Sequence, residues 1–414
     1  MKRMLAYSIY YWPEIASTAQ IYAELFEALS DEWDVTVVCA VPCYTGKVPD
    51  EYKEERLYFE EHSGVRMVRV PVREYSKEDK RSRILNILDF WLNARKATRE
   101  LGRDFDLVLT YSQPPILGGM LGAYGAAKTG APLVYGIQDF NPEQTMAVGY
   151  ADNALVHRAM MALDKRSCRK SSCVVVPGRD LGETLERRFT HEPVPCYEVI
   201  NNWADDKAIV PLPKDHPKVV SFRCKYGLEG KFVVMYSGNI GLFYDLENII
   251  KVIGEFKERD DVAFAFVGEG VVKGELEAYV HKSGLNNVCF IPYQTKEDLP
   301  YSLNVADVHL VTNAKGIKGV SCPSKTYGIM ATNVPMIGVL EPGSEVWRII
   351  EEAGCGVLVE TGDYDALEVA LRTVIEERDA FVGEHAMGRS VLEEKYSRAK
   401  AVERYRNLFR KVAP

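Results

Sequence analysis

The chain has 414 residues, of which 47% are hydrophobic and 27% charged, and it carries a formal net charge of −8. This composition excludes a largely disordered chain, and the acidic balance disfavours a general nucleic-acid binder, which usually carries a basic excess. At roughly 100–200 residues per domain, the length predicts two domains, with three as the alternative. Nine cysteines without a Cys-x-x-Cys motif or a completing His pattern favour reduced thiols over a zinc site.

The N-terminus enters a predicted strand at once. Its apolar stretch is short and is interrupted by Tyr10, Tyr11 and Pro13, which argues against a signal peptide. No run approaches the roughly 18 apolar residues that a membrane-spanning helix needs. These features predict a cytoplasmic protein that is soluble, or at most peripheral to a membrane.

Apolar runs of strand length alternate with helical patterns through the first half of the chain, which is typical of βαβ units on a parallel sheet. The runs are nearly continuous, as expected when helices cover both faces of the sheet. The first helix is predicted to begin near Ser17, and a long helix spans about residues 83–101. The predicted strands are Leu5–Tyr10, Val35–Ala40, Val65–Val70, Leu107–Tyr111, Leu133–Ile137, Cys173–Val176 and Tyr197–Ile200.

Residues 204–217 are polar and proline-rich, and they predict a linker between a first domain, residues 1–203, and a second domain, residues 218–391. The final segment, residues 392–414, is helical in pattern and is expected to pack back on the first domain. We therefore predict an α/β protein with two Rossmann-like, doubly wound domains that face a central cleft. The predicted strands of the second domain are Phe232–Ser237, Ala263–Val267, Val288–Ile291, Val308–Val311, Pro335–Val339 and Gly356–Val359.

Ligands of such sheets bind beyond the carboxyl ends of the strands, so the loops after the strands carry the functional information. Residues 238–241, Gly-Asn-Ile-Gly, could bring backbone N–H groups to a phosphate at the start of the helix predicted over Leu246–Phe256. The alternative is a simple strand-to-helix turn. Lys325 falls in the first turn of a helix beginning at Ser324, where a cation opposes the helix dipole unless an anion is near. The alternative there is a solvated lysine.

Two loops of the first domain have comparable patterns. Residues 10–14, Tyr-Tyr-Trp-Pro-Glu, offer aromatic faces that suit sugars or apolar acceptor groups. Residues 138–143, Gln-Asp-Phe-Asn-Pro-Glu, place Asp139 where a carboxylate could take a hydroxyl proton, or where it could instead cap a loop. The basic and aromatic helix over residues 81–103 could lie on an anionic membrane surface, or could pack its apolar face on a core.

Taken in order, these motifs resemble the retaining glycosyltransferases of family four, which have the two-domain B-type glycosyltransferase fold. The most similar branch makes bacterial capsule, colanic acid and O-antigen, and it includes N-acetyl-fucosamine transferases. The resemblance covers essentially the full length, and its motifs are specific to the superfamily but poor at naming a substrate. It is carried by residues 10–14, 41–47, 139–143, 199–203, 238–241, 267–270, 323–327, 354–356 and 362–363.

The resemblance implies that the second domain binds a nucleotide-sugar donor, with UDP as the expected nucleotide, and that the first domain holds a glycan or polyprenyl-linked acceptor. It implies an amino or deoxy hexose as the sugar, retention of its configuration, and no metal or other cofactor. Asp139 and Lys325 are the expected catalytic residues, and Tyr11, Trp12, Glu14 and Gln138 are expected to bind the acceptor. The expected donor-binding residues are Gly238, Asn239, Ile240, Gly241, Gly268, Glu269, Tyr293, Ser324, Lys325, Thr326 and Glu345.

Three departures from the family pattern affect these assignments. The usual Glu-x7-Glu pair is absent, with Val320 and Gly328 at its positions, so Glu345 is the candidate for ribose or sugar contacts. No basic residue follows the first strand of the second domain, where Lys325 is the substitute. Gln138 stands where many relatives have His or Arg. A nucleotide-sugar 2-epimerase and a non-catalytic sugar-nucleotide-binding subunit are the alternative functions, and an incomplete Gly-x-Gly-x-x-Gly motif disfavours a redox Rossmann enzyme.

Overall fold

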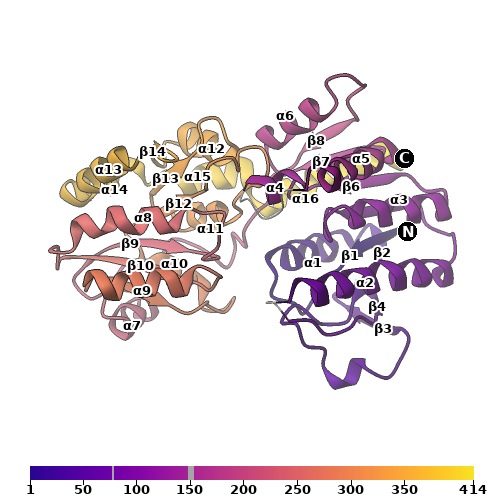
Figure 1. The fold of residues 1–414 in the computed structure, drawn as a ribbon, viewed down its shortest axis with the longest axis horizontal. Coiled ribbons are helices and arrows are strands. Elements are labelled where there is room, and N and C mark those ends of the chain that lie inside the picture. The colour runs from indigo at the N-terminus through magenta and orange to yellow at the C-terminus, as the bar shows by residue number, and fades with distance from the viewer. Residues whose placement is uncertain (77–78, 148–152) are drawn as a thin grey trace.

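The structure, a computed structural model, describes residues 1–76, 79–147 and 153–414. Two α/β units, each built on its own sheet, confirm the predicted fold class (Figure 1). No helix in the described ranges combines the length and the apolar character that crossing a bilayer would require.

The first sheet has eight strands in the order β3-β4-β2-β1-β5-β6-β7-β8, and every neighbouring pair except β3–β4 is parallel. Each predicted strand of this half is present within three residues at either end. The strands are β1 (Lys2–Ser8), β2 (Trp33–Ala40), β3 (Tyr58–His62), β4 (Val65–Val70), β5 (Leu107–Tyr111), β6 (Leu133–Gly136), β7 (Cys173–Val176) and β8 (Tyr197–Val199).

Side chains of successive β1 residues enter different cores. Met4 and Ala6 belong to the core that includes residues of α1 and of the C-terminal helix α16 (Arg398–Val412), whereas Leu5 and Tyr7 face α2 and α3. Helices therefore cover both faces of this sheet, which explains the continuous apolar runs. The helices of this half are α1 (Ser17–Leu29), α2 (Lys80–Leu101), α3 (Leu117–Thr129), α4 (Glu143–Ala147), α5 (Ala154–Lys170) and α6 (Arg179–Arg188), with a 3₁₀ turn, η1 (Asp50–Tyr52).

Helix α3 lies unusually close to the sheet because glycines face it. A Cβ on Gly122 would stand 2.2 Å from Cγ2 of Thr110, and one on Gly125 would stand 2.5 Å from the hydroxyl of Tyr7. Such distances leave no room for a larger residue. The close approach of α3 fixes α2 and α5, which pack on either side of it.

The second sheet has six parallel strands in the order β11-β10-β9-β12-β13-β14. Val234 and Tyr236 of β9 face the core that holds α8, α9 and α13, while Val233 and Met235 face the opposite core. The strands are β9 (Phe232–Ser237), β10 (Val262–Val267), β11 (Val288–Ile291), β12 (Val308–Thr312), β13 (Met336–Leu340) and β14 (Gly356–Glu360). The helices are α7 (Pro217–Lys225), α8 (Leu246–Ile253), η2 (Gly254–Phe256), α9 (Lys273–Ser283), α10 (Leu299–Val305), α11 (Lys325–Thr332), α12 (Glu345–Ala353), α13 (Tyr364–Glu376) and α14 (Arg378–His385).

The C-terminal segment is not one continuous helix, as its pattern suggested. It consists of α15 (Gly388–Val391), a π-helical turn, η3 (Leu392–Tyr396), and α16 (Arg398–Val412). Ser397 separates the last two, with extended backbone angles and a hydroxyl that accepts a hydrogen bond from the Lys400 N–H. α16 then packs against α1 of the first domain (Figure 1).

Candidate functional site

Lys325 begins α11 and lies between two tyrosine rings. Its Nζ is 3.8 Å from the centroid of the Tyr236 ring and 4.4 Å from that of the Tyr244 ring. This Nζ is buried and has no hydrogen-bond partner among the described residues. Burial lowers the pKa of Lys325 well below its ordinary value. Ring faces alone compensate a buried cation poorly, so this position is suited to receive an anion.

The glycine loop after β9 lies directly beside this lysine. A Cβ placed on Gly238 would be 3.5 Å from Cδ and 3.9 Å from Nζ of Lys325. The hydroxyl of Tyr236 donates to the Asn239 carbonyl at 2.7 Å and fixes the loop. The structure therefore brings together two of the loops that the sequence singled out separately.

The glycines of the two neighbouring loops contact each other rather than an open site. The Gly238 N–H donates to the Val267 carbonyl, and the Ile240 N–H donates to the Glu269 carbonyl, both at 2.9 Å. A Cβ on Gly268 would lie 1.9 Å from the Gly238 carbonyl oxygen. The expectation that Gly238 and Ile240 offer amides to a phosphate is thus wrong in this structure; Asn239 and Gly241 have no backbone acceptor within the described ranges.

The start of α8 is occupied by a carboxylate. Asp245 precedes the helix in the left-handed conformation, with φ of 56°, and its carboxylate accepts hydrogen bonds from Asn248 Nδ2 and from the Tyr364 hydroxyl, each at 2.7 Å. A second anion beside this carboxylate would be repelled. The prediction that the helix over Leu246–Phe256 points its N-terminus at a phosphate is therefore corrected.

The start of α11 remains as the helix end nearest to Lys325. Ser324 precedes it and makes no side-chain capping hydrogen bond. Thr326, expected to bind the donor, is fully buried, and its hydroxyl donates to the Pro323 carbonyl at 3.1 Å. Thr326 consequently shapes the helix start and does not face a ligand.

Asp139 reaches the same region from the first domain. It forms an isolated β-bridge with Ser321, and the next residue, Phe140, donates its N–H to the Val320 carbonyl at 2.8 Å. Burial raises the pKa of Asp139, against hydrogen bonds from Ser321 and Gln144 that lower it. The Tyr244 ring lies close to both: burial, and then the Asp139 charge, raise the pKa of Tyr244 to about 12. Asp139 and Lys325 thus share one site.

Two of the expected acceptor residues are held by protein groups. Gln138 is 8% exposed, and its Oε1 accepts a hydrogen bond from Asn202 Nδ2 at 2.8 Å. Glu14 Oε1 accepts hydrogen bonds from the backbone N–H groups of Cys43 and Tyr44. Both side chains order the loops around the first sheet in this structure, a role that spacing alone could not assign.

Of the two aromatic residues expected to bind the acceptor after β1, Trp12 is exposed and Tyr11 is not. Tyr11 is 2% exposed and packs on Phe26, so its ring belongs to the core and is not available for stacking. Trp12 is 38% exposed and stacks on His62, with ring centroids 3.9 Å apart. Tyr10 instead packs edge-on against Tyr44, 5.2 Å between centroids.

On the second domain, Tyr293 follows β11 and is 55% exposed. Burial, then Tyr75 and then Tyr293 raise the pKa of Tyr44 in the first domain. Glu269 is also exposed, and its carboxylate pairs with Lys273 Nζ at 2.8 Å. Among the described residues, no group of three or more His, Cys, Asp or Glu side chains is arranged to hold a metal ion.

Glu345 bridges the domains. It is 2% exposed, and its Oε2 accepts hydrogen bonds from the Arg179 backbone N–H at 2.7 Å and from Arg179 Nε at 2.9 Å. Its Oε1 accepts from Asn201 Nδ2 at 2.9 Å. Because both oxygens are engaged by the first domain, Glu345 does not offer a carboxylate to a donor ribose here, and that expectation is corrected.

Other contacts between the domains were not visible in the sequence. Asp180 Oδ2 accepts the Gly319 N–H at 2.8 Å, and a Cβ on Gly319 would stand 2.4 Å from the Thr184 hydroxyl. Lys296 pairs with Glu24 at 2.9 Å. The sequence around Gly319, Lys296 and Glu24 does not reveal these contacts, because the partners are more than a hundred residues apart in the chain.

Two family matches cover most of the chain. The Glycosyl transferase 4-like domain matches residues 18–203, and the Glycosyl transferases group 1 family matches residues 221–388. The glycosyltransferase WbjE of Pseudomonas aeruginosa is 27% identical over 270 residues, which span 65% of this chain and 66% of that protein. A protein named as the colanic acid biosynthesis glycosyl transferase WcaI of Escherichia coli is 26% identical and spans 90% of this chain and 92% of its own length.

Solved structures share the fold over the whole chain. Sucrose-phosphate synthase from Thermosynechococcus elongatus has a TM-score of 0.77 at 14% identity and covers 99% of both chains. HepE from Anabaena, solved in complex with UDP and glucose, has a TM-score of 0.72 at 14% identity with the same coverage. The order of the loops, the approach of several of them to Lys325 and the two family matches agree: the chain is a glycosyltransferase, with a glycosyl transferase 4-like domain followed by a glycosyl transferases group 1 domain.

Proposed function

We propose that this enzyme transfers a hexose, an amino or deoxy sugar, from a UDP-sugar to a glycan or polyprenyl-linked acceptor, with retention of configuration, in the synthesis of a bacterial surface polysaccharide. The observation that carries the proposal is the unpartnered Nζ of Lys325 between two tyrosine rings at the start of α11. The name of WcaI supports the pathway class, and the UDP bound to HepE supports the nucleotide.

Lys325 would hold the donor diphosphate. Its ammonium group, the α11 N-terminus and the N–H groups of Asn239 and Gly241 would together offset the charge that develops on the leaving group, so no metal is required. Tyr236 and Tyr244 exclude water from the lysine and strengthen this interaction, since charges attract more strongly where the surroundings are less polar.

Asp139 would act on the acceptor side. In a front-side displacement, the leaving diphosphate oxygen takes the proton of the acceptor hydroxyl while the protein holds the two reactants in line. The raised pKa of Asp139 and the contact of Asp139 with Ser321 support a role in positioning the acceptor against the donor domain. Asp139→Asn keeps the shape of this contact and should lower kcat more than it raises the KM for the donor.

The donor assignment can be tested by binding and turnover. UDP, GDP, ADP and dTDP sugars are screened by thermal shift, because a ligand that binds the folded state raises its apparent stability. Lys325→Met removes the charge and keeps the apolar stem; we expect roughly 100- to 1,000-fold lower kcat, as for loss of one transition-state donor. Lys282→Met, at an exposed site on α9, is the matched control. Near-normal turnover of Lys325→Met would overturn the assignment.

The same assays separate this activity from its alternatives. A nucleotide-sugar epimerase would convert the UDP-sugar without acceptor, whereas a transferase leaves the sugar configuration unchanged until an acceptor is added. Binding without transfer or hydrolysis over a broad acceptor panel would indicate a non-catalytic subunit. Full activity after treatment with EDTA is expected, and its loss would contradict metal-independent catalysis.

We further propose that the enzyme works at the cytoplasmic face of a membrane, in contact through α2. Helix α2 exposes one apolar stripe, with Ile84 56%, Leu85 42%, Leu88 37% and Leu92 47% exposed. Arg81, Arg83 and Lys96 lie on exposed positions beside it, and such a face suits an anionic bilayer surface. The protein should sediment with vesicles that contain anionic lipid, and Leu88→Glu should abolish this sedimentation. Val369→Glu, which alters an exposed apolar residue of α13, is the control and should leave it unchanged. Equal sedimentation of the two variants would refute the membrane contact through α2.

A further inference from the structure

The first turn of helix α6, in the first domain, holds a loop of the second domain. The Asp180 side chain is buried, and its Oδ2 accepts a hydrogen bond from the Gly319 N–H at 2.8 Å. Gly319 has a φ of 70°, and a Cβ there would stand 2.4 Å from the Thr184 hydroxyl and 2.8 Å from the Asp180 carbonyl oxygen. This position therefore favours glycine twice, through its backbone angle and through its contact with α6.

The last turn of the same helix holds the loop that carries Asp139. The side chain of Arg188 is 3% exposed, and its Nη2 donates to the Asn141 carbonyl at 2.8 Å. Its Nε donates to Glu143 Oε1 at 2.7 Å, and its guanidinium carbon lies 4.2 Å from the centroid of the Phe140 ring. Arg188 thus contacts three of the four residues that follow Asp139 in the chain.

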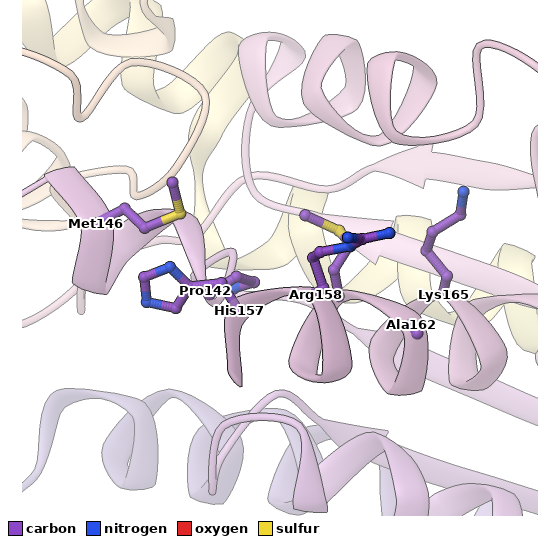
Figure 2. Close-up of a pocket in the computed structure, with 7 residues that line it drawn as sticks. Pro142, Met146, His157, Arg158, Ala162 and Lys165 are labelled. Carbon is purple, nitrogen blue, oxygen red and sulfur yellow. The ribbon is translucent and has the colours of Figure 1, made fainter. Parts of the chain in front are cut away.

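The loop of Asp139 is not close-packed on the side that faces α5. A cavity of about 350 Å³ lies there, lined by Pro142 and Met146 and by side chains of α5 (Figure 2). Arg188 is itself fixed from α5, because Asp164 Oδ2 accepts a hydrogen bond from its Nη1 at 2.5 Å. The loop therefore depends on Arg188, and through it on α6, for its position.

The two loops that α6 holds meet each other directly. The isolated antiparallel bridge between Asp139 and Ser321 joins them. Gly319 stands two residues before Ser321 in the chain, and Lys325 stands four residues after it. One helix of 10 residues thus anchors both sides of the contact at which the loops of Asp139 and Lys325 approach each other.

We propose that Asp180 and Arg188 are positioning residues of the transfer reaction: from the two ends of α6, they align Asp139 with the loop that leads to Lys325. The inference rests on the proposed function, in which Lys325 holds the donor and Asp139 positions the acceptor. Both positioning side chains are buried and hydrogen-bonded to protein groups, so they act through these loops and not on a substrate.

The alignment predicts which kinetic constant changes. A misplacement of about 1 Å can cost roughly 100-fold in rate, so loss of an anchor should lower kcat. The affinity for UDP should persist, because Lys325 and the rings of Tyr236 and Tyr244 that enclose it all belong to the second domain.

The first test compares two variants of Asp180. Asp180→Ala removes the acceptor of the Gly319 N–H, whereas Asp180→Asn retains an oxygen that can accept it. Asp180→Ala should lower kcat for transfer from a UDP-hexose at least about tenfold and leave the Kd of UDP unchanged, and Asp180→Asn should restore most of the lost kcat. Glu186→Gln, at an exposed site on the same helix, is the control. Wild-type kcat in Asp180→Ala, or a loss that Asp180→Asn does not restore, would overturn the proposal.

The second test disturbs the same contact from the second domain. Gly319→Ala places a methyl group against α6. Gly316→Ala is the matched control in the same loop, because Gly316 also has a positive φ, 87°, but its Cβ would stand 3.7 Å from the Ala147 Cβ, an ordinary contact distance. The two substitutions carry similar backbone strain, so a lower kcat in Gly319→Ala alone is expected. Equal kcat values in the two variants would contradict the role of α6.

The far end of α6 is tested with Arg188→Lys, which keeps the charge beside Asp164 and Glu143 but loses the fork of donors. We expect a lower kcat at unchanged Kd of UDP. Because both anchors serve one alignment, the double variant with Asp180→Ala should lose less activity than the product of the two single effects. A fully multiplicative loss would show two independent roles and would overturn the shared alignment.

Amide exchange gives a readout that does not need turnover. The Phe140 N–H donates to the Val320 carbonyl across the domain contact. In a peptide covering residues 139–147, exchange should be faster in Asp180→Ala than in wild type and unchanged in Glu186→Gln. Equal exchange in wild type and Asp180→Ala would overturn the proposal. If the wild-type protein binds no UDP-sugar, the proposed function fails by itself, while the exchange rates still report whether α6 holds the two loops together.

Discussion

Removal of the Glu345 carboxylate should loosen the contact between the domains. Glu345→Ala leaves the Arg179 N–H, its Nε and Asn201 Nδ2 without their acceptor. Breaking a buried ion pair by deleting one partner costs about 3–5 kcal/mol. The Arg179 side chain is 36% exposed and also contacts Glu352, so solvent and a second carboxylate compensate part of this loss. We therefore expect the free energy of local opening to fall by about 2–3 kcal/mol, less than the cost of breaking a fully buried pair.

Amide exchange measures this opening directly, because the Arg179 N–H itself donates to Glu345. In a peptide covering residues 177–184, exchange should accelerate roughly 25- to 150-fold, at a factor of ten per 1.4 kcal/mol. Glu352→Gln is the matched control: that side chain is 42% exposed, and loss of an exposed ion pair is worth about 0–1 kcal/mol. Equal protection in wild type and Glu345→Ala would show that this carboxylate does not hold the domains together.

Three further predictions follow from buried groups. UDP affinity should weaken as pH rises, by up to tenfold per pH unit, because burial lowers the pKa of Lys325 and binding of the diphosphate restores the proton on its amine. Calorimetry in buffers of different ionisation enthalpy should then report proton uptake on binding. Binding without proton uptake would contradict the assignment of Lys325. Burial lowers the pKa of His309 to about 4, so between pH 6.5 and 4 the unfolded chain binds more protons than the folded chain. The free energy of unfolding should therefore decrease by about 3 kcal/mol as the pH falls from 6.5 to 4. His309→Asn should flatten this pH dependence in urea titrations, and an unchanged slope in the variant would refute the reasoning. Gly268→Ala should displace the Gly238 carbonyl and reduce UDP affinity. Gly274→Ala has open space around its Cβ position and should leave UDP affinity unchanged. Equal UDP affinities of the two variants would contradict the role of the Gly238 loop in donor binding.

The fold was predictable wherever helices cover both faces of a sheet, because burial then produces apolar runs that stand out in the sequence. β3 was missed for the complementary reason. It is an antiparallel edge strand whose residues, Tyr-Phe-Glu-Glu-His, are at best partly buried, so two glutamates interrupt the run. The bend at Ser397 was also missed, because a capping serine inside a charged helical pattern resembles an ordinary surface residue.

The candidate site was predictable only in part. Post-strand position correctly brought Lys325 beside Gly238, since the carboxyl ends of neighbouring parallel strands meet at one sheet edge. The tyrosines that enclose this lysine looked like core residues. The partners of Glu345 depend on how two domains dock, which no local spacing encodes. Tyr11 lies in the core against the expectation, because β1 ends at Ser8 and the regular alternation of side chains along a strand does not extend to it.

The position of α16 has a consequence for how the protein is made. Its buried residues, among them Tyr405 and Phe409, complete the core beneath α1, and the Phe409 ring meets Trp33 edge-on at 6.1 Å. Domains generally fold in the order in which they leave the ribosome. Here the first domain lacks one of its helices until residues 398–412 have been synthesised, so the apolar surface of α1 stays uncovered while the second domain is being translated.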